Sequence, residues 1–173
     1  VGMRFFQKGS YSQAAERFRQ ASQLNEKSIE ATVYYAQALL AAGQYGESAR
    51  AVKESLRRNP NWPQAKLDVR TMYGDESEFG EHLAALAKHV KEQPLDADAI
   101  FLLGFELFAA GDIDRARPLL EQAAQLAPDG SHLKPFQDFY AKRDPQKSLP
   151  PEPKAAKEPI PEPDFKAEGV TSR

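Results

Sequence analysis

The side chains with the clearest potential for chemistry are one arginine and two histidines, Arg70, His82 and His89. The pKa of a histidine lies near neutrality, so a cluster of these residues would form a ligand-binding or pH-sensing polar site. The interpretation that we favour is a polar seam between helices in which each side chain has a hydrogen-bonding partner, because burial without one costs about 1–3 kcal/mol per group. A zinc site fits less well, because the histidines are seven residues apart and have no third strong ligand within helical reach. We therefore expect no metal.

The sequence contains none of the common catalytic motifs. It has no Gly-rich phosphate loop, no G-x-S-x-G, no H-E-x-x-H and no cysteine. A basic stripe could contact a phosphate or an acidic partner, although we favour a solvated helix face. The stripe consists of Arg50, Lys53, Arg57 and Arg58. The sequence thus predicts a non-catalytic protein without a cofactor.

The composition is that of a folded domain with balanced charge. The 173 residues include 23 Lys and Arg against 25 Asp and Glu, which gives a formal net charge of −2. Nucleic-acid-binding domains normally carry a basic excess, so this balance argues against a nucleic-acid partner. The longest apolar run, Ile100–Ala110, contains Glu106 and is too short for a membrane span. No direct membrane insertion is expected within this chain.

The helices that must position these side chains follow a repeat with a period of 34 residues. Gly9 and Gly43 keep this spacing, and Gly111 follows after two further periods, with Ser77 in the missing slot. An aromatic or apolar residue comes two positions later in every copy, at Tyr11, Tyr45, Phe79 and Ile113. Four copies in register, without an insertion, indicate a repeat protein.

Each copy predicts two amphipathic helices joined by a short turn. In the clearest copy, Ile100, Leu103 and Leu107 recur at helical spacing. Gly111 is expected to end that helix, and Asp112 is expected to cap the next one. Because one helix pair cannot bury both of its faces, the copies are expected to stack into a superhelix.

This pattern resembles the tetratricopeptide repeat. The clearest copy matches the signature of that family in order, through Leu103, Gly104, Leu107, Gly111, Ile113, Ala116, Leu120, Ala123 and Pro128. The resemblance implies an all-α fold, namely a right-handed α-solenoid of helix-turn-helix repeats with a C-terminal capping helix and a Pro-rich tail. The stretch Tyr73–Leu83 is similar to bacterial repeat proteins. The third copy departs from the signature, because Arg70, His82 and His89 occupy slots in which the family has small residues.

The predicted domain boundaries follow from the period and from the distribution of proline. The solenoid is expected to cover residues 1–143, with repeats at about 1–28, 29–62, 63–96 and 97–130 and a capping helix at 131–143. Val1 matches a position midway along a first helix, so we expect the first repeat to be truncated at its N-terminus. Seven of the 13 prolines lie in residues 144–173, which are expected to form an extended or disordered tail.

The resemblance also implies where a partner binds. The first helices of such solenoids line the concave face, and their variable positions contact the ligand. These positions are Phe6, Val33, Gln37, Leu40, Leu67, Thr71, Phe101, Phe105 and Phe108. We expect an extended or helical apolar peptide there, bound by a protein–protein interaction scaffold.

Two alternatives stay open at this point. The chain could instead be a structural, assembly or autoinhibitory segment whose groove is filled by its own tail or by a neighbouring chain, with self-association through the tail. Separately, the stripe formed by Phe101, Phe105 and Phe108 either meets the last helix, around Phe136, Phe139 and Tyr140, or forms an exposed aromatic groove.

Overall fold

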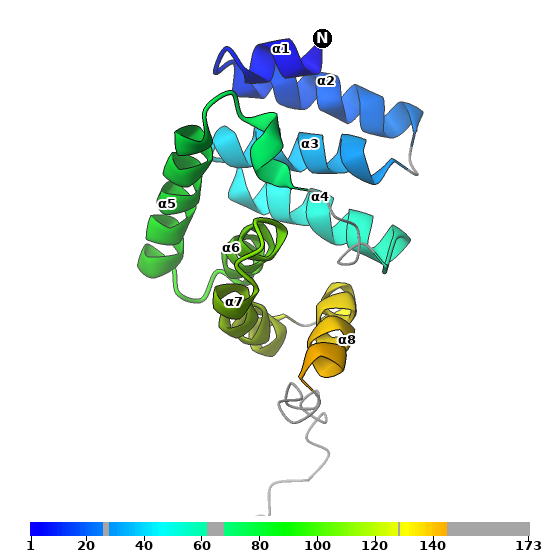
Figure 1. Ribbon diagram of the computed structural model, residues 1–173, viewed down its shortest axis with the longest axis vertical. Helices are drawn as coiled ribbons and strands as arrows, with labels where there is room; N and C mark the ends of the chain where they lie inside the picture. Colours follow the sequence, from blue (N-terminus) through cyan, green and yellow to red (C-terminus); the bar gives the residue numbers. More distant parts are fainter. Residues whose placement is uncertain (26–27, 62–67, 128, 145–173) are drawn as a thin grey trace, which may run out of the picture.

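In the computed structural model every regular element of the described residues is helical (Figure 1). The structure describes residues 1–144 except 26–27, 62–67 and 128. The α-helices are α1 (Gly2–Phe6), α2 (Tyr11–Leu24), α3 (Ile29–Ala41), α4 (Tyr45–Arg58), α5 (Glu76–Glu92), α6 (Ala97–Ala109), α7 (Ile113–Leu126) and α8 (Lys134–Arg143). Two 3-10 helices are η2 (Val69–Met72) and η3 (Ser131–Leu133). The prediction of an all-α solenoid is confirmed, whereas the expected tail lies outside the described residues beyond Asp144.

The repeating glycines are the turns between paired helices. Gly9 joins α1 to α2, Gly43 joins α3 to α4, and Gly111 joins α6 to α7. Their φ angles are +72°, +74° and +85°, in the left-handed region that only glycine adopts without strain. The prediction that Gly111 ends its helix is confirmed. Asp112 also caps α7 as predicted, since its side chain accepts a hydrogen bond from the Arg115 backbone N–H.

A second glycine in each of two pairs sits where the helices touch. A Cβ atom on Gly104 would lie 3.0 Å from Cγ of Leu120, and a Cβ atom on Gly2 would lie 2.8 Å from Cε1 of Phe18. These glycines occupy equivalent positions in the repeat, as do Leu120 and Phe18. The absence of a side chain at this position therefore lets the two helices approach closely in the α1–α2 and α6–α7 pairs.

The stacking order skips the third copy. Helix α2 packs between α1 and α3, and α4 packs against both α3 and α6, which in turn pairs with α7. The expected first helix of the third copy is wrong over its described residues, because Asp68–Asp75 contain only the 3-10 helix η2. As a result α6 follows α4 in the stack, in the place that the third copy was expected to take.

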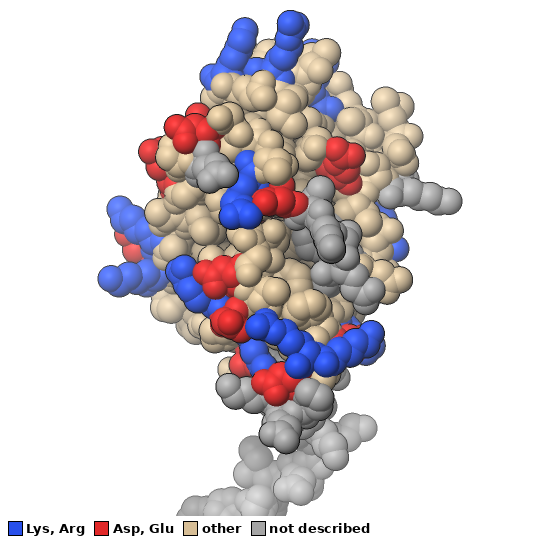
Figure 2. All heavy atoms as spheres, viewed as in Figure 1, with Lys and Arg blue, Asp and Glu red and all other residues tan. Residues whose placement is uncertain are grey.

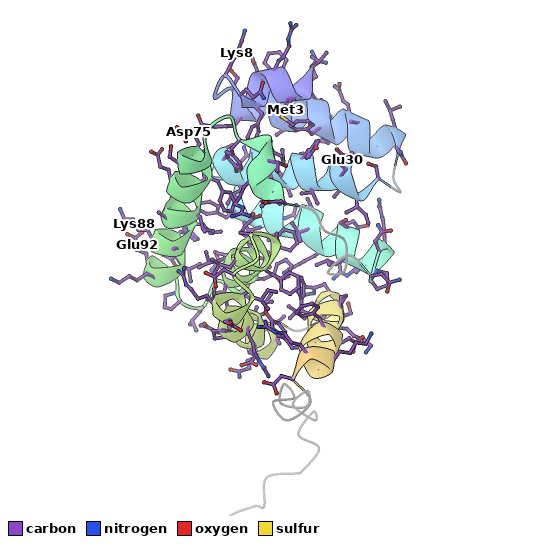
Figure 3. All side chains as sticks on the ribbon, viewed as in Figure 1. Met3, Lys8, Glu30, Asp75, Lys88 and Glu92 are labelled. Atoms are coloured by element: carbon purple, nitrogen blue, oxygen red, sulfur yellow. The ribbon has the colours of Figure 1, made fainter. Side chains whose placement is uncertain are left out.

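The sequence of the third copy accounts for this displacement. Arg70 stands where Gly2 and Gly104 allow close helix contact in the other copies, and a guanidinium side chain cannot fit in that space. In Figure 1, α5 stands apart from the stack and spans its side, while α6 and α7 run nearly along the line of sight and α1–α4 lie across it. The outer surface of α5 carries Lys88 and Glu92, which point away from the molecule (Figure 3).

We expect Gly104→Ala to destabilise the protein although alanine favours helices. The propensity gain of about 0.5–1 kcal/mol is outweighed by overpacking against Leu120, which typically costs about 1–3 kcal/mol. The free energy of unfolding, measured by urea denaturation, should fall by roughly 1–2 kcal/mol.

Gly80→Ala in α5 is the matched control, because no atom lies within 4 Å of the added Cβ atom. The free energy of unfolding of this variant should rise by about 0.5–1 kcal/mol. Two variants that gain stability equally would contradict a close helix contact at Gly104.

Candidate binding face

Seven of the nine predicted groove residues lie inside the protein. They are Phe6, Val33, Gln37, Leu40, Phe101, Phe105 and Phe108. The expectation that these side chains line an open groove is wrong, because other parts of the chain cover them. Of the remaining two, Thr71 is exposed and donates a hydrogen bond to the Asp68 carbonyl oxygen, and Leu67 lies outside the described residues.

The C-terminal elements cover the phenylalanine stripe of α6. The ring of Phe108 meets those of Phe136 and Phe139 edge to face, with centroids 5.0 and 4.9 Å apart. Phe101 meets the ring of His132 in the same way at 4.9 Å. The stripe is therefore not an exposed groove, and its contact with the last helix, the other alternative, holds for Phe108 alone. Phe105 instead lines a small apolar space together with residues of α3 and α4.

A segment of the third copy covers the face of α1 and α3. We call Val69–Phe79 the covering segment; its residues Val69, Met72, Tyr73 and Phe79 are buried. Tyr73 is its centre: its ring lies 4.9 Å from that of Phe6 on α1 and 5.5 Å from that of Phe79. In Figure 1, η2 crosses in front of α3, with which it is in contact.

Beneath Tyr73 runs a buried chain of hydrogen bonds. The Tyr73 hydroxyl donates to Oε1 of Gln37 at 3.0 Å, and Nε2 of Gln37 donates to both carboxyl oxygens of Glu106 at 2.7 Å. Neither Gln37 nor Glu106 has exposed surface. These hydrogen bonds join the covering segment, α3 and α6, which are far apart in the sequence.

Burial sets the protonation of Glu106. Removal from water disfavours the carboxylate and raises the pKa of Glu106 from 4.5 to about 8, against the opposing effect of the Gln37 hydrogen bond. The carboxyl group is therefore mostly neutral at pH 7. Sequence reasoning missed this group; the signal was a lone carboxylate in the otherwise apolar run Ile100–Ala110.

The predicted polar cluster of Arg70, His82 and His89 does not form one site. Each side chain has a partner of its own, as we expected, but they do not line the shared helix seam of the interpretation that we favoured. Arg70 pairs with Asp68 at 2.7 Å on the surface, Nε2 of His82 lies 3.2 Å from the Tyr11 hydroxyl, and Nε2 of His89 lies 3.1 Å from Oδ2 of Asp96. Burial lowers the pKa of His82, so its ring is less readily charged. The two histidines attach the ends of α5 to different parts of the stack.

Three of the four residues of the basic stripe on α4 are paired with acidic side chains. Lys53 pairs with Asp98, Arg57 with Asp129 at 3.1 Å, and Arg58 with Glu54 at 2.9 Å. In Figure 2, basic and acidic side chains likewise alternate on the face in view. These pairs favour the solvated face over a phosphate site.

The described residues also lack two other features. They contain no group of three or more His, Asp or Glu side chains arranged to hold a metal ion. None of their helices combines the length and the apolar character needed to cross a membrane.

Comparison with known proteins finds one family model that matches the N-terminal part of the chain. Residues 5–67 match the family model described as tetratricopeptide repeat. The matched range extends from α1 through α4, and thus includes the turns at Gly9 and Gly43. No curated protein matches the chain.

We expect Glu106→Gln to change how stability depends on pH. Between pH 4.5 and about 8 the unfolded chain ionises Glu106 and the folded chain does not, so this group lowers the stability of the wild type as pH rises. Below pH 4.5 its effect disappears. The variant has no such group. Its free energy of unfolding minus that of the wild type should therefore be larger at pH 8.5 than at pH 4, by on the order of 2–4 kcal/mol.

The measurement is urea unfolding of both proteins from pH 4 to pH 9. His132 contributes with the opposite sign, because burial lowers its pKa from 6.5 to about 4, but this contribution cancels in the difference between the two proteins. A difference that stays constant over this range would mean that Glu106 is ionised in the folded state.

Proposed function

We propose that this chain, whose residues 5–67 belong to the tetratricopeptide repeat family, is a non-catalytic protein–protein interaction scaffold that binds an extended or helical apolar peptide. Repeats of this family generally mediate contacts between proteins. The ligand would lie on the face of α1 and α3 that carries Phe6 and Gln37, supported by Glu106 of α6.

The observation that supports this proposal most strongly is that the face already holds a peptide-like stretch. The backbone is extended on either side of η2, with φ and ψ of −90° and 104° at Asp68, just before the covering segment, and −81° and 139° at Tyr73 within it. The covering segment contacts α1, α3 and α5 through side chains rather than as a paired helix. The same face is therefore shaped for a non-helical or short helical segment.

The contacts of Tyr73 indicate the chemistry of the ligand. An aromatic ring fits between Phe6 and Phe79, and a hydroxyl group reaches the amide of Gln37. Apolar side chains at the positions of Val69 and Met72 complete the contact. A peptide with a tyrosine between apolar residues would reproduce these interactions.

A second candidate is a structural or autoinhibitory role in which the face stays filled by the protein's own chain. The deep burial of Tyr73 and Met72 favours it, because displacing them exposes apolar surface. The occupant in the structure is an internal segment, whereas the alternative stated from the sequence named the tail or a neighbouring chain. The tail of that alternative, residues 145–173, lies outside the described residues.

A labelled peptide with the sequence Asp68–Phe79 distinguishes the two candidates. We expect it to bind the Tyr73→Ala variant saturably, and at least about tenfold more tightly than the wild type, whose face is occupied. The reason is that the variant loses the ring and hydroxyl contacts that hold its own segment. Fluorescence anisotropy measures both affinities, and circular dichroism verifies that the variant is folded.

Two controls accompany this test. Thr71→Ala changes an exposed side chain of the same segment and should behave as the wild type. A peptide with alanine in place of tyrosine should not bind. If Tyr73→Ala does not fold, hydrogen exchange of the backbone amides in the wild type distinguishes the two candidates. A covering segment that can be displaced must exchange its amide hydrogens faster than α3 and α6. Lack of peptide binding, or exchange only through global unfolding, favours the structural role.

A further inference from the structure

A cleft of about 280 Å³ lies between the C-terminal end of α4 and helix α8, and we call it the basic cleft. On one side it is lined by the end of α4 and by the turn at Pro60 and Asn61 that follows this helix. On the other side it is lined by α8 and by Ser131 of η3, which packs against α4. The lining also includes Leu56 and Pro135, two buried residues that give the cleft an apolar part.

The charged side chains of the basic cleft are mostly cationic. Arg57, Lys134 and Lys142 line it, against the single acidic residue Asp138. Arg57 is held by Asp129 at 3.1 Å, and Lys134 pairs with Asp138 at 2.9 Å in an exposed pair on one helix. Lys142 is exposed and forms no ion pair with another described residue. Figure 2 shows basic side chains on the part of the surface where α8 lies. An excess of positive charge beside apolar side chains favours an acidic ligand that also carries apolar groups.

One stretch of the same chain has the complementary composition. Glu158–Phe165 contains three acidic residues, three prolines and the apolar Ile160 and Phe165, and it has no basic residue. Residues 145–157 contain three lysines against one glutamate, so like charge would keep them out of the basic cleft. Proline restricts the backbone before binding, and a stretch rich in proline therefore loses less conformational entropy when it docks.

The position of this stretch in the chain allows it to reach the basic cleft. Lys142 lines the cleft and lies only two residues before Asp144, where the described residues end. A flexible linker of the length of residues 145–157 has ends about 20 Å apart on average, and it spans about 40 Å when extended. Helix α8, with 10 residues, is roughly 15 Å long. Docking within one molecule therefore needs no stretched linker, and the effective concentration of the docking stretch is in the millimolar range.

We propose that Glu158–Phe165 docks in the basic cleft of its own chain. Its acidic side chains would lie at Lys134 and Lys142, and its apolar side chains would contact Leu56 and Pro135. Docked in this way, the stretch would hold α8 against α4 and so secure the C-terminal elements that cover α6. The basic cleft is separate from the face of α1 and α3, so this proposal does not depend on the peptide ligand of that face.

The test compares the backbone amide NMR spectra of two full-length proteins, the wild type and a neutralised variant with Glu158→Gln, Glu162→Gln and Asp164→Asn. We expect the amide shifts of the two proteins to differ at Asn61 and along α8. They should agree around Lys8, which follows α1 at the end of the stack opposite α8 (Figures 1 and 3).

A peptide with the sequence Lys157–Lys166 provides the second arm of the test. When it is added to the neutralised variant, it should shift the same amides saturably. It should bind the wild type at least about threefold more weakly, because the wild type's own stretch competes for the cleft at millimolar effective concentration. A peptide with alanine in place of Ile160 and Phe165 should bind more weakly, because it loses the apolar contacts.

Lys142→Glu and Lys8→Glu, each made in the neutralised variant, are matched substitutions of exposed side chains. They change the net charge equally, one in the basic cleft and one remote from it. Lys142→Glu should weaken binding of the Lys157–Lys166 peptide roughly fivefold, because an attractive charge pair becomes a repulsive one. Lys8→Glu should leave the affinity unchanged. Circular dichroism verifies that both variants are folded.

Four results would overturn the proposal. The first is an unchanged amide spectrum around the basic cleft in the neutralised variant, and the second is a peptide that shifts amides elsewhere, such as the face of α1 and α3. The third is equal weakening by Lys142→Glu and Lys8→Glu, which would indicate unspecific attraction between charges. The fourth is a spectral difference that grows with protein concentration, because the cleft is then occupied by the tail of another molecule.

Discussion

The distance between the two helices of a repeat is the constraint on which this structure depends. Gly2 and Gly104 let the helix axes approach until Phe18 and Leu120 touch the opposite backbone. Protein interiors are packed too densely to accept an additional side chain at such a contact without movement. Arg70 stands at the same position in the third copy, and there the described residues form no paired first helix. The three copies that stack thus have a small residue at this position, Gly2, Ala36 or Gly104, whereas the copy that does not has Arg70.

The displaced third copy packs against the other copies and stabilises them. Helix α5 spans the side of the stack, and its two histidines hold it at separate points, His82 at Tyr11 of α2 and His89 at Asp96 before α6. The segment before it covers the inner face. The departures from the repeat signature therefore have structural partners, and together they explain why the stack continues from α4 to α6.

The buried chain from Tyr73 through Gln37 to Glu106 gives this arrangement its specificity. An apolar contact would tolerate small shifts of the covering segment, whereas a hydrogen-bonded chain in a dry interior requires defined positions. Its stability depends on a neutral carboxyl group, because an ionised Glu106 would be costly at this depth. The same groups hold the hydroxyl of Tyr73 on the face of α1 and α3, and the peptide ligand that we propose would use this contact in its place.

The sequence by itself determined the features that arise from local chemistry. Gly111 could be recognised as a turn because only glycine adopts its backbone angles readily, and Asp112 as a cap because its side chain reaches a nearby N–H group. Helical periodicity and the 34-residue spacing predicted the all-α repeat fold, because they too reflect interactions between residues close together in the sequence. The meeting of the phenylalanine stripe with the last helix was foreseen only as one of two alternatives.

Tertiary structure alone decided which surfaces remain free. Gln37 was placed on an open groove because family position says nothing of what covers it, and it is buried by Glu106, 69 residues away, and by Tyr73. The pairing of α6 with α4 likewise depends on a copy that leaves the stack, which no periodicity shows. Contacts of this kind form between residues remote in the chain. Their energies depend on how all the helices pack together, and local sequence patterns do not show this.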